Sequence, residues 1–359
     1  MRVRAASTLA GYPASSAASS TCATLAIAIA LAMASAAPGH AAPASRQIDA
    51  DQRQGQDWLA KIQTSARKRN YSGTFVYQQG QQMRTSRIVH VWDGKNEVEK
   101  LEILDGAQRE FIRTDKQVVC YVPATKTKRI ERRTSQDLFP SVLASAGADL
   151  RDAYVIRQQG ESRVAGYAVQ SLLLQPRDQW RYGYRLWAEK KTGLLLKMET
   201  LDDQGAVLEQ IAFTELNMHG VDRKDAASSF TGTERWRVES AYLEDGPPSG
   251  WTAAWLPPGF KKIQEVKRLV SEATTPISGE KSQGNLGRIV TQIVYSDGLA
   301  AVSVFVEPKG QHRVEGSVRQ GAIHITGKRH GDFWVTTVGE APAAAIKKIA
   351  ESIQFKLSK

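Results

Sequence analysis

Residues 87–122, RIVHVWDGKNEVEKLEILDGAQREFIRTDKQVVCYV, carry the pattern that decides the fold. Short runs rich in Val, Ile, Leu, Phe and Tyr alternate with turn signals at Asp93-Gly94, Asp105-Gly106 and Asp115-Lys116. Glycine tolerates a positive φ, and aspartate hydrogen-bonds to its own backbone, so each break suits a tight reversal between two strands. The stretch therefore predicts an antiparallel meander.

The same alternation extends in both directions from this stretch. It begins at Tyr71 and continues past turn signals at 190–193 and 202–205. No long helices separate the strands, which excludes a parallel sheet with crossover helices. A meander of this length must curl or close, and a helix expected over 56–69 would lie on its core face. A short helix or an ordered flap is expected at 135–150.

Two polar breaks, at 222–229 and 244–250, predict a domain boundary near Thr231. Beyond them the chain has the pattern of a small α+β domain that closes with a helix over 342–353, whose first turn accommodates Pro342 without losing a hydrogen bond. A mature chain of this length exceeds what one core usually supports. The expected division is a signal peptide at 1–41, a large sheet domain at 42–230, a linker or hinge at 231–250 and a small domain at 251–359.

The first forty residues have the order of a secretory signal peptide. Basic residues precede an apolar run over 25–34, and a small-residue stretch follows at 35–42. The apolar run is about 10 residues long, well short of the roughly 20 that span a bilayer. We therefore expect cleavage near Ala41, export of the mature chain, and disorder over 43–54 at its start.

Charge and cysteine use fit an exported protein. Of the 48 Lys and Arg residues, Arg2 and Arg4 lie in the leader, which leaves 46 against 37 acidic residues, or about +9. Outside the cytoplasm the abundant polyanions are lipid headgroups, lipopolysaccharide and acidic protein segments, so nucleic acid is not expected as a partner; the alternative is that the charge only maintains solubility. Cys120 is the one cysteine left, so no internal disulfide is expected, and its apolar neighbours predict a buried strand position.

Catalytic signatures are missing from the sequence. It contains no G-x-S-x-G, H-E-x-x-H, C-x-x-C or G-x-G-x-x-G motif. His324 and His330 could approach one another but lack a nearby carboxylate or thiolate, so no metal or cofactor is expected. Glu97, Glu99 and Glu102 suit a solvated strand face rather than a catalytic pair. We expect a binding protein; the alternative is an envelope hydrolase with an unrecognised site.

Two basic clusters are the candidates for a binding surface. Guanidinium and ammonium groups gathered in this way can bind phosphate or carboxylate; the alternative is an edge strand whose charges prevent aggregation. Trp251 and Trp255 lie beside the second cluster and are expected in the core, with an interface as the alternative. The candidates for contact with a lipid headgroup or an acidic peptide are Lys128, Arg129, Arg132, Arg133, Lys261, Lys262, Lys267 and Arg268.

The chain also resembles a known family. W-L-P-P-G-F at 255–260 and, further on, I-V-Y-S-D-G-L at 293–299 resemble the C-terminal domain of the MucB/RseB family of sigma-E regulators. Their order and spacing, together with matches in the earlier part of the chain, extend the resemblance over essentially the whole mature protein. The earlier matches are Y-S-G-T-F-V-Y at 71–77, L-D-G at 104–106 with R-E at 109–110, and D-Q-G at 203–205 leading to L-E-Q at 208–210.

The resemblance implies an α+β fold and a regulatory function. The implied fold is a large curved antiparallel β-sheet, similar to the half-barrel of lipoprotein carriers, with packed helices and an apolar cavity, followed by a smaller C-terminal α+β domain. The implied function is that of a periplasmic negative regulator of the envelope-stress sigma factor. Such a protein binds the periplasmic domain of a membrane anti-sigma factor and shields it from regulated proteolysis, and lipid or lipopolysaccharide releases it.

Alternatives to this function stay open at this point. A periplasmic lipid or lipoprotein carrier would use the same cavity but would not bind an anti-sigma peptide. A homo-oligomer is a further alternative, and the loop at 271–287 is longer than is typical of the family. If lipid and peptide prefer different arrangements of the two domains, each must weaken the other by the same factor, with the hinge at 231–250.

Overall fold

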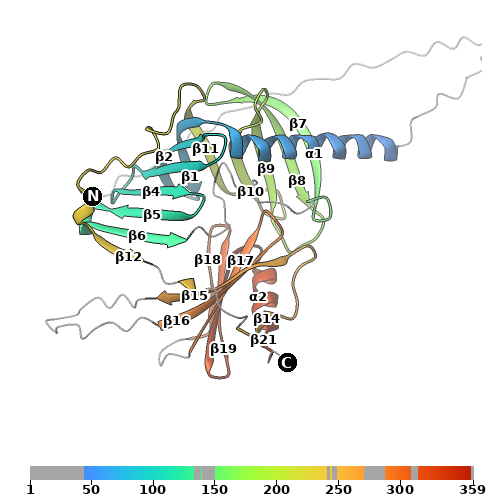
Figure 1. Ribbon diagram of the computed structural model, residues 1–359. Coiled ribbons are helices and arrows are strands. Elements are labelled where there is room, and N and C mark those ends of the chain that lie inside the picture. The colour runs from blue at the N-terminus through green and yellow to red at the C-terminus, as the bar shows by residue number, and fades with distance from the viewer. Residues whose placement is uncertain are drawn as a thin grey trace, which may run out of the picture. The chain divides into compact units, whose positions relative to one another are not determined.

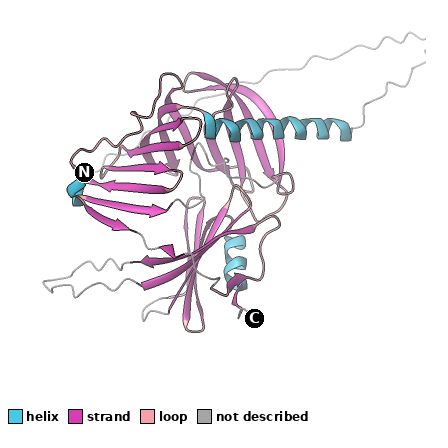
Figure 2. Cartoon of the chain, in the orientation of Figure 1, coloured by secondary structure: helices cyan, strands magenta, loops and turns pink. Residues whose placement is uncertain are grey.

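The computed structural model describes residues 44–132, 139, 150–240, 243–244, 249–270, 288–308 and 314–356. The expected signal peptide, the 271–287 loop and most of the expected flap at 135–150 lie outside these residues. Strands make up most of the described chain, and two α-helices accompany them (Figure 2). Neither of these two helices combines the length and the hydropathy of a membrane-spanning segment.

Twelve strands form one large sheet (Figure 1). They are β1 (Tyr71–Gln79), β2 (Gln82–Trp92), β3 (Glu97–Ile103), β4 (Arg109–Thr114), β5 (Gln117–Val122), β6 (Thr127–Arg132), β7 (Tyr154–Val164), β8 (Tyr167–Pro176), β9 (Gly183–Glu189), β10 (Leu195–Leu201), β11 (Val207–Asn217) and β12 (Arg237–Ser240), with 3₁₀ turns at Pro123–Thr125 and Thr233–Arg235. Their order is β12-β6-β5-β4-β3-β2-β1-β11-β10-β9-β8-β7. The chain thus forms two antiparallel meanders that join where β1 pairs with β11, and β12 adds to β6 in parallel.

The tight reversals fall where the sequence predicts them. Gly94, Gly106 and Gly205 have φ angles of +94°, +72° and +81° between successive strands. In the first of these turns, Asp93 Oδ1 accepts the backbone N–H of Lys95 at 3.0 Å. Local turn chemistry therefore sets the meander, and the predicted antiparallel sheet is confirmed.

Helix α1 (Ala44–Lys68) packs on the large sheet beside β7. Leu59 and Ile62 are buried in the main hydrophobic core. Gln52 covers the outer edge of β7, since its Oε1 accepts the Ile156 N–H at 3.2 Å and its Nε2 donates to the Tyr154 carbonyl at 3.5 Å. The disorder predicted over 43–54 is wrong from Ala44 onward, where the helix begins, and residue 43 lies outside the described residues.

A second sheet of seven strands follows, in the order β13-β15-β16-β17-β20-β19-β18. Its buried residues form a separate core with helix α2 and the small β14–β21 pair. Pro342 stands at the N-cap of α2, one position before its predicted place in the first turn. The elements are β13 (Leu243–Glu244), β14 (Trp251–Ala253), β15 (Lys261–Val270), β16 (Arg288–Ser296), β17 (Ala301–Pro308), β18 (Gly316–Gln320), β19 (Ile323–His330), β20 (Phe333–Glu340), α2 (Ala343–Ser352) and β21 (Ile353–Phe355).

Three expectations for single residues need correction. Cys120 lies on β5 as predicted but is half-buried, and this burial raises the pKa of its thiol. Glu99 is buried and paired with Arg113 at 2.8 Å, so it does not lie on a solvated face. His324 and His330 lie at opposite ends of β19 and have different neighbours.

Candidate functional site between the two sheets

The first predicted basic cluster lies on β6, next to the edge strand β12. Lys128 is half-buried, and Arg129 is exposed and paired with Glu239 of β12 at 2.9 Å. Arg132 ends the strand, while Arg133 lies outside the described residues. The Arg129–Glu239 pair joins β6 to the edge strand β12. This placement agrees with the alternative interpretation of the cluster, in which its charges protect a sheet edge from aggregation.

The second predicted cluster lies along β15. Lys261 and Lys262 are exposed near its start, and Lys262 Nζ pairs with Glu265 at 3.0 Å. Lys267 and Arg268 are half-buried at positions that pair with β13. The two clusters therefore belong to different sheets, and each stands beside a short edge strand.

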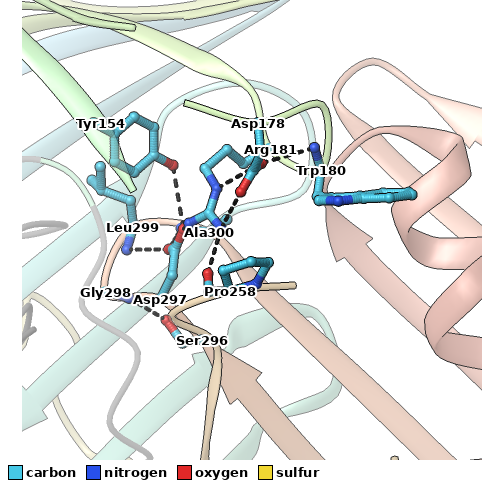
Figure 3. Close-up of polar contacts among 10 residues, drawn as sticks. All are labelled: Tyr154, Asp178, Trp180, Arg181, Pro258, Ser296, Asp297, Gly298, Leu299 and Ala300. Carbon is cyan, nitrogen blue, oxygen red and sulfur yellow. Dashed lines mark hydrogen bonds and ion pairs between the residues drawn. The ribbon is translucent and has the colours of Figure 1, made fainter. Parts of the chain in front are cut away.

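A polar site that sequence reasoning did not select joins the two sheets (Figure 3). The β8–β9 loop of the large sheet supplies Asp178, Trp180 and Arg181. The other side consists of the two motifs W-L-P-P-G-F at 255–260 and Y-S-D-G-L at 295–299. The motifs that resemble the known family thus meet at one point, on the guanidinium of Arg181.

Arg181 uses four of its N–H bonds in this site. Nε and Nη2 donate to the carboxylate of Asp178 at 3.1 and 2.9 Å. Nη1 donates to Asp297 Oδ2 and Nη2 to the Pro258 carbonyl, both at 2.5 Å. The planar fork of a guanidinium can make this set of contacts, which an ammonium group cannot.

The Arg181 side chain is fully buried, with 0% of its surface exposed. Its guanidinium carbon lies 5.6 Å from the ring centroid of Tyr154 and 5.4 Å from that of Phe260. Burial disfavours its charge, but the hydrogen bond with Asp178 and the charge of Asp297 outweigh this effect, so the pKa of Arg181 stands above its ordinary value. Arg181 therefore stays charged between one aromatic ring from each sheet.

Asp297 receives donors from both sheets. Its Oδ1 accepts the N–H groups of Leu299 at 3.0 Å and Ala300 at 2.8 Å, which shapes the β16–β17 turn. Its Oδ2 accepts from Arg181 and from the Tyr154 hydroxyl at 3.4 Å. Burial raises the pKa of Asp297 above its ordinary value, and the Leu299 N–H, the charge of Arg181 and the Ala300 N–H oppose that rise. The carboxylate is thus shared between a local turn and the inter-sheet contact.

Aromatic side chains extend the site. Trp180 and Trp255 pack edge to face, with ring centroids 5.0 Å apart. Lys348 of α2 places its Nζ 4.7 Å from the Trp180 ring and 4.1 Å from the Trp255 ring, within the range of a cation–π interaction. Trp251 lies in the core as predicted, whereas Trp255 takes the interface position that was the alternative.

The chemistry of this site is that of a structural contact. The polar groups of Arg181 and Asp297 are engaged with one another and with the backbone, which leaves neither poised as a base or nucleophile. Among the described residues, no group of three or more His, Cys, Asp and Glu side chains is arranged to hold a metal ion. The geometry supports fixing one sheet against the other.

Comparison with known proteins identifies the family. The model of the MucB/RseB N-terminal domain matches residues 54–231, and the model of the MucB/RseB C-terminal domain matches residues 245–354. The sigma factor AlgU regulatory protein MucB of Pseudomonas aeruginosa is 32% identical to the chain over 320 residues, which cover 88% of this chain and 93% of MucB. The chain belongs to the MucB/RseB family.

Other members of the MucB/RseB family extend the comparison. The sigma-E factor regulatory protein RseB of Escherichia coli K12 is 24% identical over 301 residues, which cover 83% of this chain and 89% of RseB. The crystal structure of MucB in complex with MucA(peri) matches with a TM-score of 0.62 and 29% identity, over 85% of this chain and 100% of that chain. A structure of the Pseudomonas aeruginosa MucA/MucB complex matches with a TM-score of 0.64 and 28% identity, over the same shares of the two chains.

Proposed function

We propose that this member of the MucB/RseB family is a periplasmic negative regulator of an envelope-stress sigma factor. It binds the periplasmic region of a membrane anti-sigma factor and shields that region from regulated proteolysis. The supporting observation is the match along the entire MucB chain in its complex with MucA(peri). The protein acts by binding rather than by catalysis, in keeping with the regulatory names of its relatives.

Export is part of this proposal. The leader at 1–41 directs the chain out of the cytoplasm and is removed near Ala41. N-terminal sequencing of the protein recovered from a periplasmic extract tests this step. A first residue within a few positions of Ala42 is expected, whereas a cytoplasmic protein that keeps its leader would contradict the proposal.

The partner surface is proposed to include the two basic clusters. The exposed Lys261 and Lys262 offer charge to an acidic peptide segment or an anionic headgroup. Lys267 and Arg268 of β15 and Lys128 and Arg132 of β6 are proposed to add to this charge, as is Arg133, which lies outside the described residues. Arg129 is already paired with Glu239 and Lys262 with Glu265, so each offers less charge than Lys261. Charge reversal of Lys261 and Lys262 is expected to weaken peptide binding about tenfold, with a reduced dependence on salt.

Binding of the partner is the decisive measurement. The periplasmic segment of the anti-sigma factor from the same organism is titrated into the purified mature protein by calorimetry, with a scrambled segment as the control. A 1:1 complex that slows cleavage of the segment by the regulatory protease is expected. A protein that binds acyl chains but ignores the segment would instead be a carrier.

Release by lipid is the second step of the proposal. We place the hinge at 231–250, where β12 belongs to the large sheet and β13 to the second sheet. Lipid and peptide that prefer different arrangements of the sheets must weaken each other by the same factor. Titration with lipopolysaccharide at fixed peptide is expected to lower peptide affinity, and an unchanged affinity at saturating lipopolysaccharide would exclude this step while leaving partner binding intact.

A further inference from the structure

The two sheets also touch away from Arg181, where the end of β1 meets the β18–β19 turn. Gln79 Nε2 donates to the Gln320 carbonyl at 3.3 Å. Gly321 follows with a φ of +59°, and a Cβ atom there would collide with the Gln79 amide. Beside it, the Tyr182 hydroxyl lies 3.3 Å from His324 Nδ1. This second contact is close-fitting and polar.

Each sheet brings a carboxyl group to this contact. Glu209 lies on β11, opposite Gln79 of β1, and accepts from the Tyr77 hydroxyl at 2.7 Å and from Gln79 Nε2 at 3.4 Å. Glu340 ends β20, opposite Ile323 of β19. The carboxylate of Glu209 is therefore held by donors from its own sheet. On the other sheet, Glu340 lies in the same cross-strand row as Gln320, the residue whose carbonyl accepts from Gln79.

Glu340 is in a setting that disfavours its charge. Burial, followed by repulsion from Glu209, raises the pKa of Glu340 to about 7. A negative charge close to Glu340 disfavours its ionisation, so the proton of Glu340 is held more tightly beside Glu209. A protonated Glu340 removes the repulsion and gains an O–H that can donate.

The other titratable groups of the contact do not compensate for the charge of Glu340. Tyr77 of β1 and Tyr184 of β9 feel its charge and have raised pKa values, mainly through burial. The Tyr184 hydroxyl is buried without a hydrogen-bond partner in the described structure. His324 of β19 donates from Nδ1 to the Ala341 carbonyl at 2.9 Å, and burial lowers its pKa. The cationic side chains that act on these neighbours are Arg84, which acts on Tyr77, and Arg319, which acts on Tyr182 and His324.

We propose that the Glu209–Glu340 pair makes the contact between the two sheets proton-dependent. Protonation of Glu340 favours the arrangement in which the sheets touch at Gln79 and Gln320, and loss of that proton favours their separation. The effect requires no partner protein, so it can be tested independently of the proposed regulatory function. It adds envelope acidity to the conditions that set the arrangement of the two sheets.

The direction follows from proton linkage. Separation returns Glu340 to water, where the pKa of a glutamate is about 4.3, so the touching arrangement binds the proton more tightly. The proton on Glu340 stabilises the touching arrangement fully at low pH, and this stabilisation is lost as pH rises through the raised pKa. One proton changes this equilibrium by at most tenfold per pH unit between about pH 5 and pH 7.

Distance measurement between the sheets tests the proposal. Spin labels are placed at Lys116→Cys in the large sheet and Lys347→Cys on α2, both exposed, in a Cys120→Ser background. The fraction of molecules at the shorter distance is expected to fall from pH 5 to pH 8. Glu340→Gln, which is permanently neutral, is expected to keep the short distance at every pH. Glu209→Gln is expected to make the fall between pH 5 and pH 8 smaller, because only burial then raises the pKa of Glu340.

Controls separate this effect from general acid behaviour. Glu351→Gln removes an exposed carboxylate of α2 and is expected to leave the pH profile unchanged. Circular dichroism establishes that each variant is folded, and Glu209→Gln provides a second test if Glu340→Gln fails to fold. A wild-type distance distribution that does not change between pH 5 and pH 8, or a Glu340→Gln variant that keeps the wild-type profile, overturns the proposal.

Discussion

Arg181 is the residue on which the contact between the sheets most depends. It is buried, its charge is paired with Asp297, and it reaches the backbone of the W-L-P-P-G-F motif at Pro258. Removing one partner of a buried ion pair leaves the other charge without compensation, which costs more than the pair itself contributes. The stability of the protein should therefore respond to this side chain far more than to exposed arginines.

Arg181→Ala is expected to lower the free energy of unfolding by about 3–5 kcal/mol. The loss comes from the uncompensated carboxylate of Asp297, and urea unfolding measures it through a lower midpoint. Arg181→Lys keeps the charge but not the fork, so an intermediate loss is expected. The matched control is Arg129→Ala, whose pair with Glu239 is 61% exposed on the arginine side and should cost no more than about 1 kcal/mol. Equal losses for Arg181→Ala and Arg129→Ala would show that Arg181 is not a buried anchor.

Glu189 stabilises the turn between β9 and β10 through its charge. It accepts the N–H of Lys191 at 3.0 Å and the N–H and hydroxyl of Thr192 at 2.6 and 2.7 Å. Burial works to raise the pKa of Glu189, but these hydrogen bonds outweigh it and hold the pKa below its ordinary value. A group with a lowered pKa contributes stability above its unfolded pKa and loses that contribution as pH falls through the folded value.

Glu189→Gln is therefore expected to cost about 1–2 kcal/mol at pH 7 and less at about pH 3.5. Urea unfolding at the two pH values measures the difference between variant and wild type. Glu161→Gln is the control, because Glu161 pairs with Lys190 of the same turn but is 61% exposed. A cost for Glu189→Gln that stays constant down to about pH 3.5 would show that the charge of Glu189 is not what stabilises the turn.

At the scale of elements, helix α1 is positioned by the turns it packs on. Lys61 Nζ donates to the Lys190 carbonyl at 2.6 Å, and a Cβ atom on Gly193 would lie 2.6 Å from Lys61 Cγ. Gly193 has a φ of +81°, the same as Gly205 in the β10–β11 turn, where a Cβ would meet nothing within 4 Å. The two glycines thus share a backbone conformation and differ in their neighbours.

Comparing alanine substitutions at Gly193 and Gly205 distinguishes the cost of backbone strain from the cost of displacing α1. Gly205→Ala is expected to cost about 1 kcal/mol, the penalty for a positive φ, and Gly193→Ala about 1–3 kcal/mol more because α1 must shift. Thermal unfolding of the two variants gives the comparison. Hydrogen exchange in α1 should rise in Gly193→Ala alone. Identical behaviour of the two variants would mean that α1 does not rest on this turn.

Elements with local signals could be predicted from the sequence, and contacts between distant elements could not. The turns at Gly94 and Gly106 are encoded within a few residues, and so is the closing helix after Pro342. The pairing of β1 with β11 and of Arg181 with Asp297 joins residues far apart in the chain, 116 positions in the second case. In the sequence Asp297 looks like an ordinary turn residue, because it also accepts a backbone N–H in the β16–β17 turn. Nothing local distinguishes a loop arginine that will be buried from one that stays in water.

At the scale of the whole molecule, two contacts make the sheets interdependent. The first comprises Arg181 with Asp297 and Trp180 with Trp255, and the second joins Gln79 to Gln320. Most buried residues of the two sheets belong to separate hydrophobic cores, although Leu299 of the β16–β17 turn is buried in the first core. Each sheet could therefore unfold separately if the contacts between them were lost. The residues that resemble the known family in the second sheet thus serve the link between sheets as well as the sheet itself.

The wild-type protein is expected to unfold in a single calorimetric transition, and the Trp180→Ala/Arg181→Ala variant in two. Both substitutions lie in the β8–β9 loop, so the motifs at 255–260 and 295–299 keep their own residues. Loss of the coupling is expected to separate the two midpoints by roughly 10 °C, since a few kcal/mol shift the midpoint of a unit this size by several degrees. Gln179→Ala, at an exposed position that directly precedes Trp180 in the same loop, should leave one transition. A double variant that still unfolds in one transition, only at lower temperature, would show that the remaining contacts, including Tyr154 with Asp297 and Gln79 with Gln320, suffice to couple the two sheets.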